Sequence, residues 1–430
     1  MRILFVSGEL IGADLCYRLK QEGNDVKMYI RDPKRRECMG GMVKKTSDWR
    51  KELDWVGKSG LVVFDDVGYG QEQDRLRKKG YRVVGGSALG DRLEKDREYG
   101  QKVLAECGVE TIKTHFFKNA SEAYDFVEKN PDLWVIKNGN HDSSLCYVGH
   151  SKDGSDCLGV LSSYKKSGVK PIYLQKKVVG VEIAVGRFFN GRDWVGPICL
   201  NVEHKTLFPG GMGPMTGEMG TLMWHDTDEK NKLFQKTLSK LGSVLRESGY
   251  KGYIDINCIV RGQMVTPLEV TSRFGCPTNQ LQTELILSSW TDLLSALADG
   301  DMRDISFKKG YGIVITIAAP PFPYQGISSR YFLKGSQIRF RRSLSDQEMR
   351  HLHFEEVSFL ESKNNREYNI SGQSGFILYI SGSGRTIHEA RNKTYDLAKD
   401  VIVPKMFYRT DIGTQFSEKE LPLLQKWGWV

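Results

Sequence analysis

The sequence has no long apolar run, no closely spaced cysteine pair and no low-complexity segment among its 430 residues. A membrane helix needs about 20 apolar residues, and the longest candidate, at 313–322, is shorter and ends in prolines. The N-terminal apolar run at 2–6 is too short for a signal peptide. The eight cysteines are scattered without a Cys-x-x-Cys pair, which argues against a disulfide framework or a structural zinc site. These absences predict a cytoplasmic protein that makes no membrane contact.

A strong charge of one sign is also absent, because 62 Lys and Arg residues are balanced by 53 Asp and Glu residues. The formal net charge of +9 suits a phosphate-rich small molecule as well as a nucleic acid. No helix-turn-helix or aromatic–basic module accompanies it, so nucleic acid is not expected as a partner. With 40% hydrophobic and 27% charged residues, the composition is that of an enzyme-sized globular protein of two or three domains.

The first hundred residues alternate between apolar strands and helices. The expected elements are strands at 2–6, 25–30, 60–64 and 81–84 and helices at 12–21 and 71–79. Strands joined by single helices form a parallel sheet with right-handed crossovers, so region 1–100 is predicted to be a Rossmann-like α/β domain. Its ligands would lie beyond the carboxyl ends of the strands, near Ser7-Gly8 and residues 65–70.

The rest of the chain predicts an α+β arrangement with hairpins. Asn190-Gly191 and Arg261-Gly262 are expected as hairpin turns. Single helices are expected at 91–108, 231–248 and 280–298. Strands are expected at 134–136, 172–175, 182–189, 194–200, 253–260 and 264–270. A turn at Gly300-Asp301 separates a region 101–305 from a last region 306–430.

The segment 203–220, EHKTLFPGGMGPMTGEMG, is rich in glycine and is expected to be neither helix nor strand. Backbone amides outside regular structure and unhindered by side chains can bind phosphate or carboxylate oxygens. The alternative is a flexible surface loop. Long loops inside compact domains are often functional, which favours a binding loop.

A predicted hairpin brings polar residues together. Asp255 and Asn257 point to one face of their strand, as do Glu269 and Thr271 on the next. If the strands pair, two carboxylates and two neutral oxygen ligands converge, which suits Mg²⁺ completed by phosphate and water. The alternative is a solvated polar face.

Other charged positions each allow two interpretations. Lys137 ends the apolar strand LWVIK and either reaches a phosphate or marks the strand end. Glu182 interrupts VVGVEIAV and either faces outward or accepts hydrogen bonds from a ribose or adenine. Arg409 and Asp411 in FYRTDIG either form a local ion pair or belong to a site. His115, His204 and His225 do not have the spacing of metal ligands, so we expect them to be structural or surface residues.

Five segments resemble motifs of the phosphoribosylamine–glycine ligase family, which are ATP-grasp enzymes of purine synthesis. EHKTLFPGGMGPMTGEMG resembles the family's DHKR…GPNTGGMG loop, and LEVTSRFGCPTNQ resembles its EFNxRFGDPExQ strand. VVGVEIAV is similar to LxGEExS, LEKDREYGQKVLAECGVET to the SKxFxK helix, and residues 386–413 to the segment that ends in YRxDIG. The resemblance covers nearly the whole chain. It implies an ATP-grasp core at 101–305 between the Rossmann-like domain and a C-terminal α+β domain at 306–430.

The resemblance also implies a reaction, a set of cofactors and a set of site residues. Glycine, or another amino acid, would be joined to a phosphorylated amine at the expense of ATP, with Mg²⁺ or Mn²⁺, in a monomer or homodimer. ATP would contact Arg97, Lys137, Gln175 and Glu182. The metal ligands would come from Glu269, Asp255, Asn257 and Thr271, with Arg273 and Glu269 catalytic. The substrate-binding residues would be His204, Lys205, Gly213, Pro214, Thr216, Gly217, Met219, Gly220, Arg409, Asp411 and Gly413.

Several positions depart from the family pattern. The family's GGREHA is GELIGAD here, the asparagine of EFN is Thr271, and the acidic pair of FGDPE is Cys276 and Thr278. The stretch after Lys137 is NGNHDSSLCYVG, without the family's GKG. Two alternatives therefore stay open. The reaction that the resemblance implies first is phosphoribosylamine plus glycine plus ATP giving glycinamide ribonucleotide, ADP and phosphate. The alternatives to it are a ligase for a different amino acid and amine and a nucleotide-binding homologue without turnover.

Overall fold

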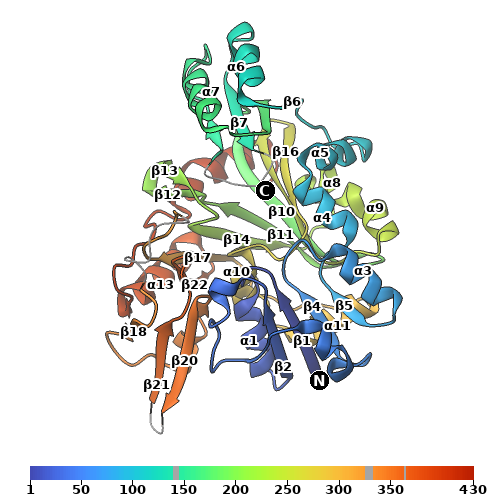
Figure 1. Ribbon diagram of the computed structural model, residues 1–430, viewed down its shortest axis with the longest axis vertical. Coiled ribbons are helices and arrows are strands. Elements are labelled where there is room, and N and C mark those ends of the chain that lie inside the picture. Colours follow the sequence, from blue (N-terminus) through green and yellow to red (C-terminus); the bar gives the residue numbers. More distant parts are fainter. Residues whose placement is uncertain (139–144, 325–332, 363–364) are drawn as a thin grey trace.

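A five-stranded parallel sheet forms the N-terminal unit of the computed structural model, which describes residues 1–138, 145–324, 333–362 and 365–430 (Figure 1). Its elements are β1 (Arg2–Ser7), α1 (Ala13–Gln21), β2 (Asp25–Ile30), β3 (Lys44–Thr46), α2 (Leu53–Val56), β4 (Leu61–Phe64), α3 (Gly70–Lys78) and β5 (Arg82–Val84). The strand order is β3-β2-β1-β4-β5, with β1 parallel to both neighbours. The Rossmann-like prediction is confirmed. The short polar strand β3 was not predicted.

The helix expected at 91–108 is two helices, α4 (Ala88–Lys95) and α5 (Arg97–Glu106). Asp96 separates them because its backbone is extended, with φ −104° and ψ 91°. Its side chain accepts a hydrogen bond from the backbone N–H of Tyr99, which caps α5. The prediction of one helix was wrong for this reason.

A small lobe follows and projects from the body of the molecule (Figure 1). It contains β6 (Thr114–Phe117), α6 (Ala120–Lys129), β7 (Trp134–Asn138), β8 (Tyr147–Val148), α7 (Ser155–Ser167) and β9 (Ile172–Lys176). The sheet order is β6-β9-β7-β8, and Trp134, Ile136 and Leu174 lie in the core between sheet and helices. Part of the stretch NGNHDSSLCYVG, residues 139–144, lies outside the described residues.

An eight-stranded antiparallel sheet forms the centre of the molecule. Its strands are β10 (Val181–Asn190), β11 (Trp194–Glu203), β14 (Gly220–Asp226), β15 (Lys251–Arg261), β16 (Met264–Thr271), β17 (Tyr311–Ala318), β19 (Leu352–Phe354) and β22 (Phe376–Gly384). The order is β16-β15-β10-β11-β14-β17-β22-β19. Both predicted hairpins are present. The sheet runs across the boundary expected near residue 305, because β14 pairs with β17.

Two further predicted helices are also divided. The first becomes α8 (Lys232–Lys236) and α9 (Gly242–Glu247), because Thr237 leaves helical geometry at φ −130° and ψ −90°. The second becomes α10 (Thr278–Leu285) and α11 (Trp290–Asp299). Ser289 starts α11 by accepting a hydrogen bond from the backbone N–H of Asp292.

The C-terminal residues add a second small sheet and the covering helices. These elements are β18 (Gln337–Phe340), α12 (Asp346–Met349), β20 (Val357–Ser362), β21 (Asn365–Ile370), α13 (Ile387–Asp400), β23 (Val401–Ile402) and α14 (Leu421–Trp427). Helix α13 packs closely on β22, where a Cβ at Gly382 would lie 2.6 Å from Thr394 Oγ1. No helix in the described ranges has the length and apolar character needed to cross a bilayer.

Candidate active site

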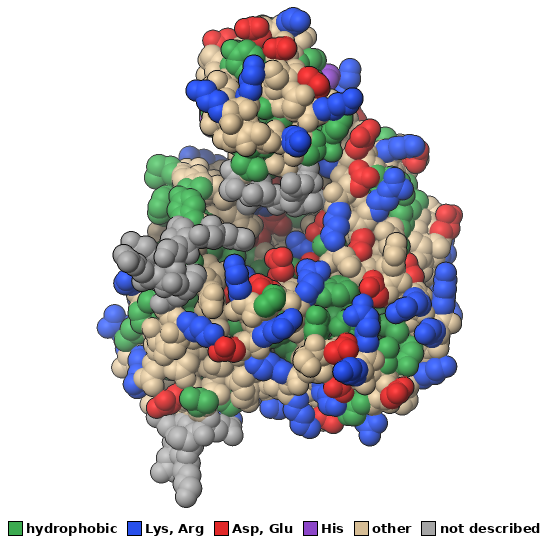
Figure 2. All heavy atoms as spheres, viewed as in Figure 1, with side chains coloured by type: hydrophobic (Ala, Val, Ile, Leu, Met, Phe, Trp, Pro, Cys, Tyr) green, Lys and Arg blue, Asp and Glu red, His purple; other side chains and the backbone are tan. Residues whose placement is uncertain are grey.

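The candidate site lies where the central sheet faces the small lobe. Figure 2 shows a hollow in the surface beneath the lobe, with acidic side chains visible inside it. Strands β15 and β16 supply part of its floor. Their register places Asp255 opposite Thr271 and Asn257 opposite Glu269. The pairing that the sequence predicted for these four residues is therefore present.

Lys205 connects the carboxylates of this floor. Its Nζ lies 2.9 Å from Glu269 Oε1, 2.9 Å from Glu203 Oε2 and 3.8 Å from Glu182 Oε1. Although burial opposes it, the charges of these carboxylates raise the pKa of Lys205 well above its usual value. The Lys205 ammonium in turn lowers the pKa of Glu269, so this carboxylate is ionised at neutral pH. Glu269 is 37% exposed and can still be reached by a ligand.

Asn257 and Asp255 carry oxygen atoms that have no partner. Asn257 Nδ2 donates to Glu182 Oε1 at 2.9 Å and to Glu203 Oε2 at 3.0 Å, while its Oδ1 is buried and unpaired. Asp255 Oδ1 is also buried and unpaired, and Thr271 hydrogen-bonds the Asp255 side chain. Unpaired oxygens beside an ionised Glu269 fit a divalent cation.

A cation at Glu269 would need some of its coordinating oxygens from a bound substrate or from water. The described ranges contain no group of three or more His, Cys, Asp or Glu side chains arranged to hold a metal ion. Phosphate and water oxygens would therefore complete the coordination of a cation at Glu269.

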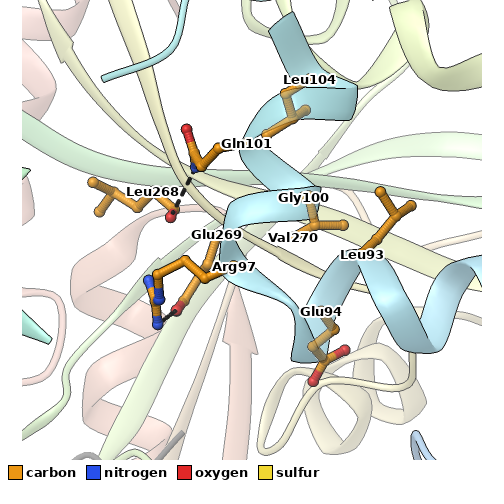
Figure 3. Close-up of a pocket in the computed structure, with 9 residues that line it drawn as sticks. All are labelled: Leu93, Glu94, Arg97, Gly100, Gln101, Leu104, Leu268, Glu269 and Val270. Carbon is orange, nitrogen blue, oxygen red and sulfur yellow. Dashed lines mark hydrogen bonds and ion pairs between the residues drawn. The ribbon is translucent and has the colours of Figure 1, made fainter. Parts of the chain in front are cut away.

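Positive charge gathers on the lobe side of Glu269. Arg97 Nη2 lies 3.9 Å from Glu269 Oε2, and Figure 3 shows this pair in a pocket between α5 and β16. Burial, with the charge of Arg97, lowers the pKa of Lys137 to about 8. The pocket is lined by Leu93, Glu94, Arg97, Gly100, Gln101, Leu104, Leu268, Glu269 and Val270. Arg97 and Lys137 thus give the cleft the positive charge that phosphates require.

The other two residues expected to contact ATP, Gln175 and Glu182, differ in how exposed they are. Gln175 on β9 is 2% exposed, and its Nε2 donates to Thr114 Oγ1 at 2.7 Å within the lobe. Glu182 on β10 is 43% exposed in the cleft. Burial raises the pKa of Glu182 despite the nearby charge of Lys205.

Arg273 pairs with the N-terminal unit. Its Nε lies 3.0 Å from Glu94 Oε1 and 3.7 Å from Asp66 Oδ1. These carboxylates outweigh burial and raise the pKa of Arg273 above its usual value. In this structure Arg273 therefore links α4 to the loop after β4.

The glycine-rich segment is more ordered than the sequence predicts, and the expectation of no regular structure was wrong. It forms a hairpin of β12 (Thr206–Phe208) and β13 (Met212–Met215), the latter containing Gly213 and Pro214. The backbone N–H of Thr216 donates to the carbonyl of Lys205, and that of Met219 donates to the carbonyl of His204. These amides are satisfied within the hairpin and are not free for a ligand.

The other expected substrate residues surround this hairpin. Met219 is fully buried with Leu207 and Ala318, so its side chain belongs to the core. Gly217 lies near Phe376, and Gly220 begins β14. Burial and the charge of Arg409 lower the pKa of His204 to about 4.

The C-terminal segment holds the hairpin in place. Arg409 pairs with both oxygens of Asp411 at 2.8 and 2.7 Å and donates to Thr206 Oγ1 at 2.8 Å. Asp411 accepts from the backbone N–H of Gly210 at 2.9 Å, and that of Gly413 donates to His204 Nε2 at 3.3 Å. The ion pair expected as one alternative is present, and it also anchors residues 206–210.

The loop after β1, where the sequence predicts a ligand, is filled by an internal carboxylate. Asp65 is fully buried and accepts hydrogen bonds from Ser7 Oγ at 2.6 Å, the backbone N–H of Gly8 at 3.1 Å and that of Gly12 at 2.8 Å. Burial and the charge of Asp66 raise the pKa of Asp65 to about 7. An anion would have to displace this side chain to reach the start of α1.

Three carboxylates near the site were not predicted. Glu203 precedes the predicted His204 and Lys205, and alternation along β11 gives only a weak signal for it. Glu94 lies on α4 and has no sequence signal. Glu218 replaces a glycine in the resembled GPNTGGMG motif, and that replacement is a signal the sequence does offer.

Comparison with known proteins relates this geometry to a family. Residues 95–279 match the family model described as the phosphoribosylglycinamide synthetase, ATP-grasp (A) domain. The phosphoribosylamine–glycine ligase of Helicobacter pylori is 26% identical over 354 residues, covering 79% of this chain and 78% of the relative. That of Clostridium acetobutylicum is 24% identical, with 79% of this chain and 80% of the relative covered.

Solved structures agree on the fold. The phosphoribosylamine–glycine ligase of Thermotoga maritima superimposes with a TM-score of 0.71 at 20% identity, over 96% of this chain and all of that one. A biotin carboxylase of Campylobacter jejuni gives a TM-score of 0.62 at 12% identity, over 94% and 92% of the two chains. The chain is therefore similar to phosphoribosylamine–glycine ligases over most of its length, and its residues 95–279 match the ATP-grasp domain of that family.

Proposed function

We propose that this chain is an ATP-dependent carboxylate–amine ligase that joins glycine to phosphoribosylamine, giving glycinamide ribonucleotide, ADP and phosphate. The observation that carries the proposal is the set of Glu269 and Asn257 on the sheet with Lys205 between β11 and β12, facing Arg97 and Lys137. The relatives named phosphoribosylamine–glycine ligase support the choice of substrates. The protein is expected to work in the cytoplasm as a monomer or homodimer.

The reaction has two steps, and in each step one bond forms as another breaks. A glycine carboxylate oxygen bonds to the γ-phosphorus of ATP as the bond to the β,γ-bridging oxygen breaks, which releases ADP. The amine nitrogen then bonds to the acyl carbon, the bond from that carbon to the phosphate oxygen breaks, and the nitrogen loses a proton. Positioning and charge neutralisation supply most of such a rate enhancement.

Each group of residues has one part in this scheme. Lys137 and Arg97 bind phosphate oxygens, and Glu182 faces the nucleoside. Glu269, with Asn257 or Asp255, would hold Mg²⁺ or Mn²⁺, and the ion would neutralise phosphate charge when bound. Lys205 lies between Glu269 and Glu203, where it orients the substrate carboxylate. Arg273 would stabilise the acyl phosphate once released from Glu94.

A second candidate is a ligase of the same kind that acts on a different amine. The occupied loop after β1 favours it, because Asp65 fills the backbone donors that a phosphate group would use. A product assay by mass spectrometry with ATP, Mg²⁺, glycine and fresh phosphoribosylamine separates the two. Glycinamide ribonucleotide with matching ADP supports the first candidate. ADP release only with another amino acid and amine supports the second.

A further inference from the structure

Glu218 is a buried carboxylate in the turn that leads into β14. It is 4% exposed and accepts a hydrogen bond from the hydroxyl of Thr221. No ion pair between Glu218 and a basic side chain occurs in the described part of the chain. Burial and the negative charge of Glu203 raise the pKa of Glu218 well above its usual value. Burying a carboxylate that has no paired cation costs free energy.

Negative charge exceeds positive charge around Glu218. Glu203 lies opposite Thr221 in the β11–β14 pairing, and the hydroxyl of Thr221 donates to Glu218, so the two carboxylates are neighbours. Lys205 is the basic side chain that lowers the pKa of Glu218. That lysine is shared, since its Nζ lies 2.9 Å from both Glu203 and Glu269. Because a metal ion at Glu269, Asn257 and Asp255 would balance the charge of Asp255, the carboxylate that lacks a cation of its own is Glu218, beside Glu203.

Unpaired polar atoms border the same cluster. Asn257 lies 3.0 Å from Glu203, and its Oδ1 has no partner. Both polar side-chain atoms of Asn201 are buried and unpaired, two residues before Glu203 on the same face of β11. Ala184 on β10 lies between them, opposite Asn201 on one side and Asn257 on the other. The side chains of Asn201, Ala184 and Asn257 are all buried, so a ligand that pairs with these polar atoms would be enclosed by protein.

The spacing favours an ammonium group over a metal ion. The described ranges hold no group of three His, Cys, Asp or Glu side chains arranged for a metal ion, and a metal at Glu203 and Glu218 would be a second one beside that proposed at Glu269. An ammonium has three donors that reach oxygens about 2.8 Å away, so it can join acceptors that are farther apart.

We propose that Glu218 and Glu203 bind the ammonium group of the amino acid substrate, an inference that rests on the proposed ligase activity. In an α-amino acid this group is one carbon from the carboxylate that is phosphorylated, and Glu203 is separated from Glu269 only by the Lys205 ammonium. The acceptor amine fits less well, because a nucleophile must keep its lone pair free of a proton. The site thus selects amino acids over hydroxy acids.

Glu218→Gln tests the proposal, since it removes the charge and keeps the volume. We expect the KM for glycine to rise about 10- to 100-fold, with the KM for ATP and for phosphoribosylamine within about twofold. Preference for glycine over glycolate should fall by a similar factor. Glu128→Gln, an exposed change on α6, is the matched control. An unchanged KM for glycine, or a raised KM for phosphoribosylamine instead, would overturn the proposal.

Direct binding keeps the test independent of turnover. Binding of ¹³C-glycine is followed by NMR in the presence of ADP and Mg²⁺, for the wild type, Glu218→Gln and Glu203→Gln. If the wild type forms no product, the ligase assignment fails, and the binding comparison still decides this site. Weaker binding by both variants supports it. Equal binding by either folded variant, or no glycine binding by the wild type, contradicts it.

Discussion

Individual side chains in the cleft form one electrostatic unit, because Lys205 neutralises part of the charge on Glu203, Glu182 and Glu269. Each of these residues has its partners set by β-sheet register, so the unit exists before any ligand arrives. Preorganised charge of this kind is what phosphoryl transfer needs. The chemistry should therefore respond sharply to the removal of a single charge.

Glu269→Gln should lower kcat by about 100-fold or more while the protein stays folded, because it removes the charge proposed to ligate the metal and keeps the volume. Steady-state kinetics and thermal melting check both parts. Glu128→Gln, on the exposed face of α6, should leave kcat unchanged. Near-normal turnover of Glu269→Gln would remove this residue from the metal site.

Nucleotide affinity should depend on the protonation of Lys137, whose pKa is lowered to about 8. The charged form binds phosphates, so affinity for ATP is full below pH 8 and falls as the pH rises above it. Lys137→Met should bind ATP more weakly and lose this dependence between pH 7 and 9. Isothermal titration at several pH values measures it, with Lys102→Met, an exposed change on α5, as the control. A wild-type affinity that stays flat across this range would contradict the assignment.

The sequence alone predicted part of the electrostatic unit around Lys205. Period-two alternation was enough to place Asp255, Asn257, Glu269 and Thr271 on one face. The same rule could not bring Glu94 to Arg273, because that pairing joins residues 179 positions apart. Contacts between distant segments depend on how whole elements pack, which local patterns do not encode.

Among the elements, the β12–β13 hairpin depends on the C-terminal segment for its position. Arg409 reaches Thr206, and Asp411 reaches the backbone of Gly210. Charge-assisted hydrogen bonds in a partly buried setting are stronger than those at the surface. The hairpin should therefore loosen when this anchor is removed.

Arg409→Met should raise the KM for the amine substrate about 10-fold and speed proteolytic cleavage at residues 209–212, with little change in ATP affinity. Limited proteolysis and kinetics check this. Arg342→Met is the control, because Arg342 makes a similar bidentate pair with Glu348 at an exposed site. Equal cleavage rates in wild type and Arg409→Met would show that the anchor is dispensable.

Helix boundaries show where element-level prediction works and where it fails. The apolar and polar patterns located the helical segments at 91–108, 231–248 and 280–298, but they missed the breaks inside them. Ser289 followed by Asp292 matches a helix-start pattern, so that break could have been found. The break at Thr237 has no comparable signal, because its φ and ψ follow from packing.

At the scale of the whole molecule, a buried polar contact joins the N-terminal unit to the central sheet. Asp14 on α1 lies 2.8 Å from His353 Nδ1 on β19 and 2.8 Å from Arg18 Nε. Burial raises the pKa of Asp14, but the charges of Arg18 and His353 outweigh it and leave the pKa below its usual value. Breaking a buried pair leaves the partner charge without compensation.

Asp14→Asn should lower the free energy of unfolding by about 3 kcal/mol at pH 7. The folded pKa lies below the unfolded value, so this stabilisation is present above about pH 4 and is lost as the pH falls further. Urea unfolding at pH 7 and pH 3 measures the difference, which should shrink at pH 3. Asp25→Asn, in an exposed pair with Lys44, should change stability by less than about 1 kcal/mol. A loss as small as that of the control at pH 7 would contradict the role of Asp14.

The cleft is proposed to perform amide ligation driven by ATP, and a product assay tests this directly. Mass spectrometry should follow products formed from ATP, Mg²⁺, glycine and freshly generated phosphoribosylamine. We expect glycinamide ribonucleotide in equal amount to ADP, and loss of both products with Glu269→Gln. Tight ATP binding without product, across a broad panel of amino acids and amines, would contradict the claim.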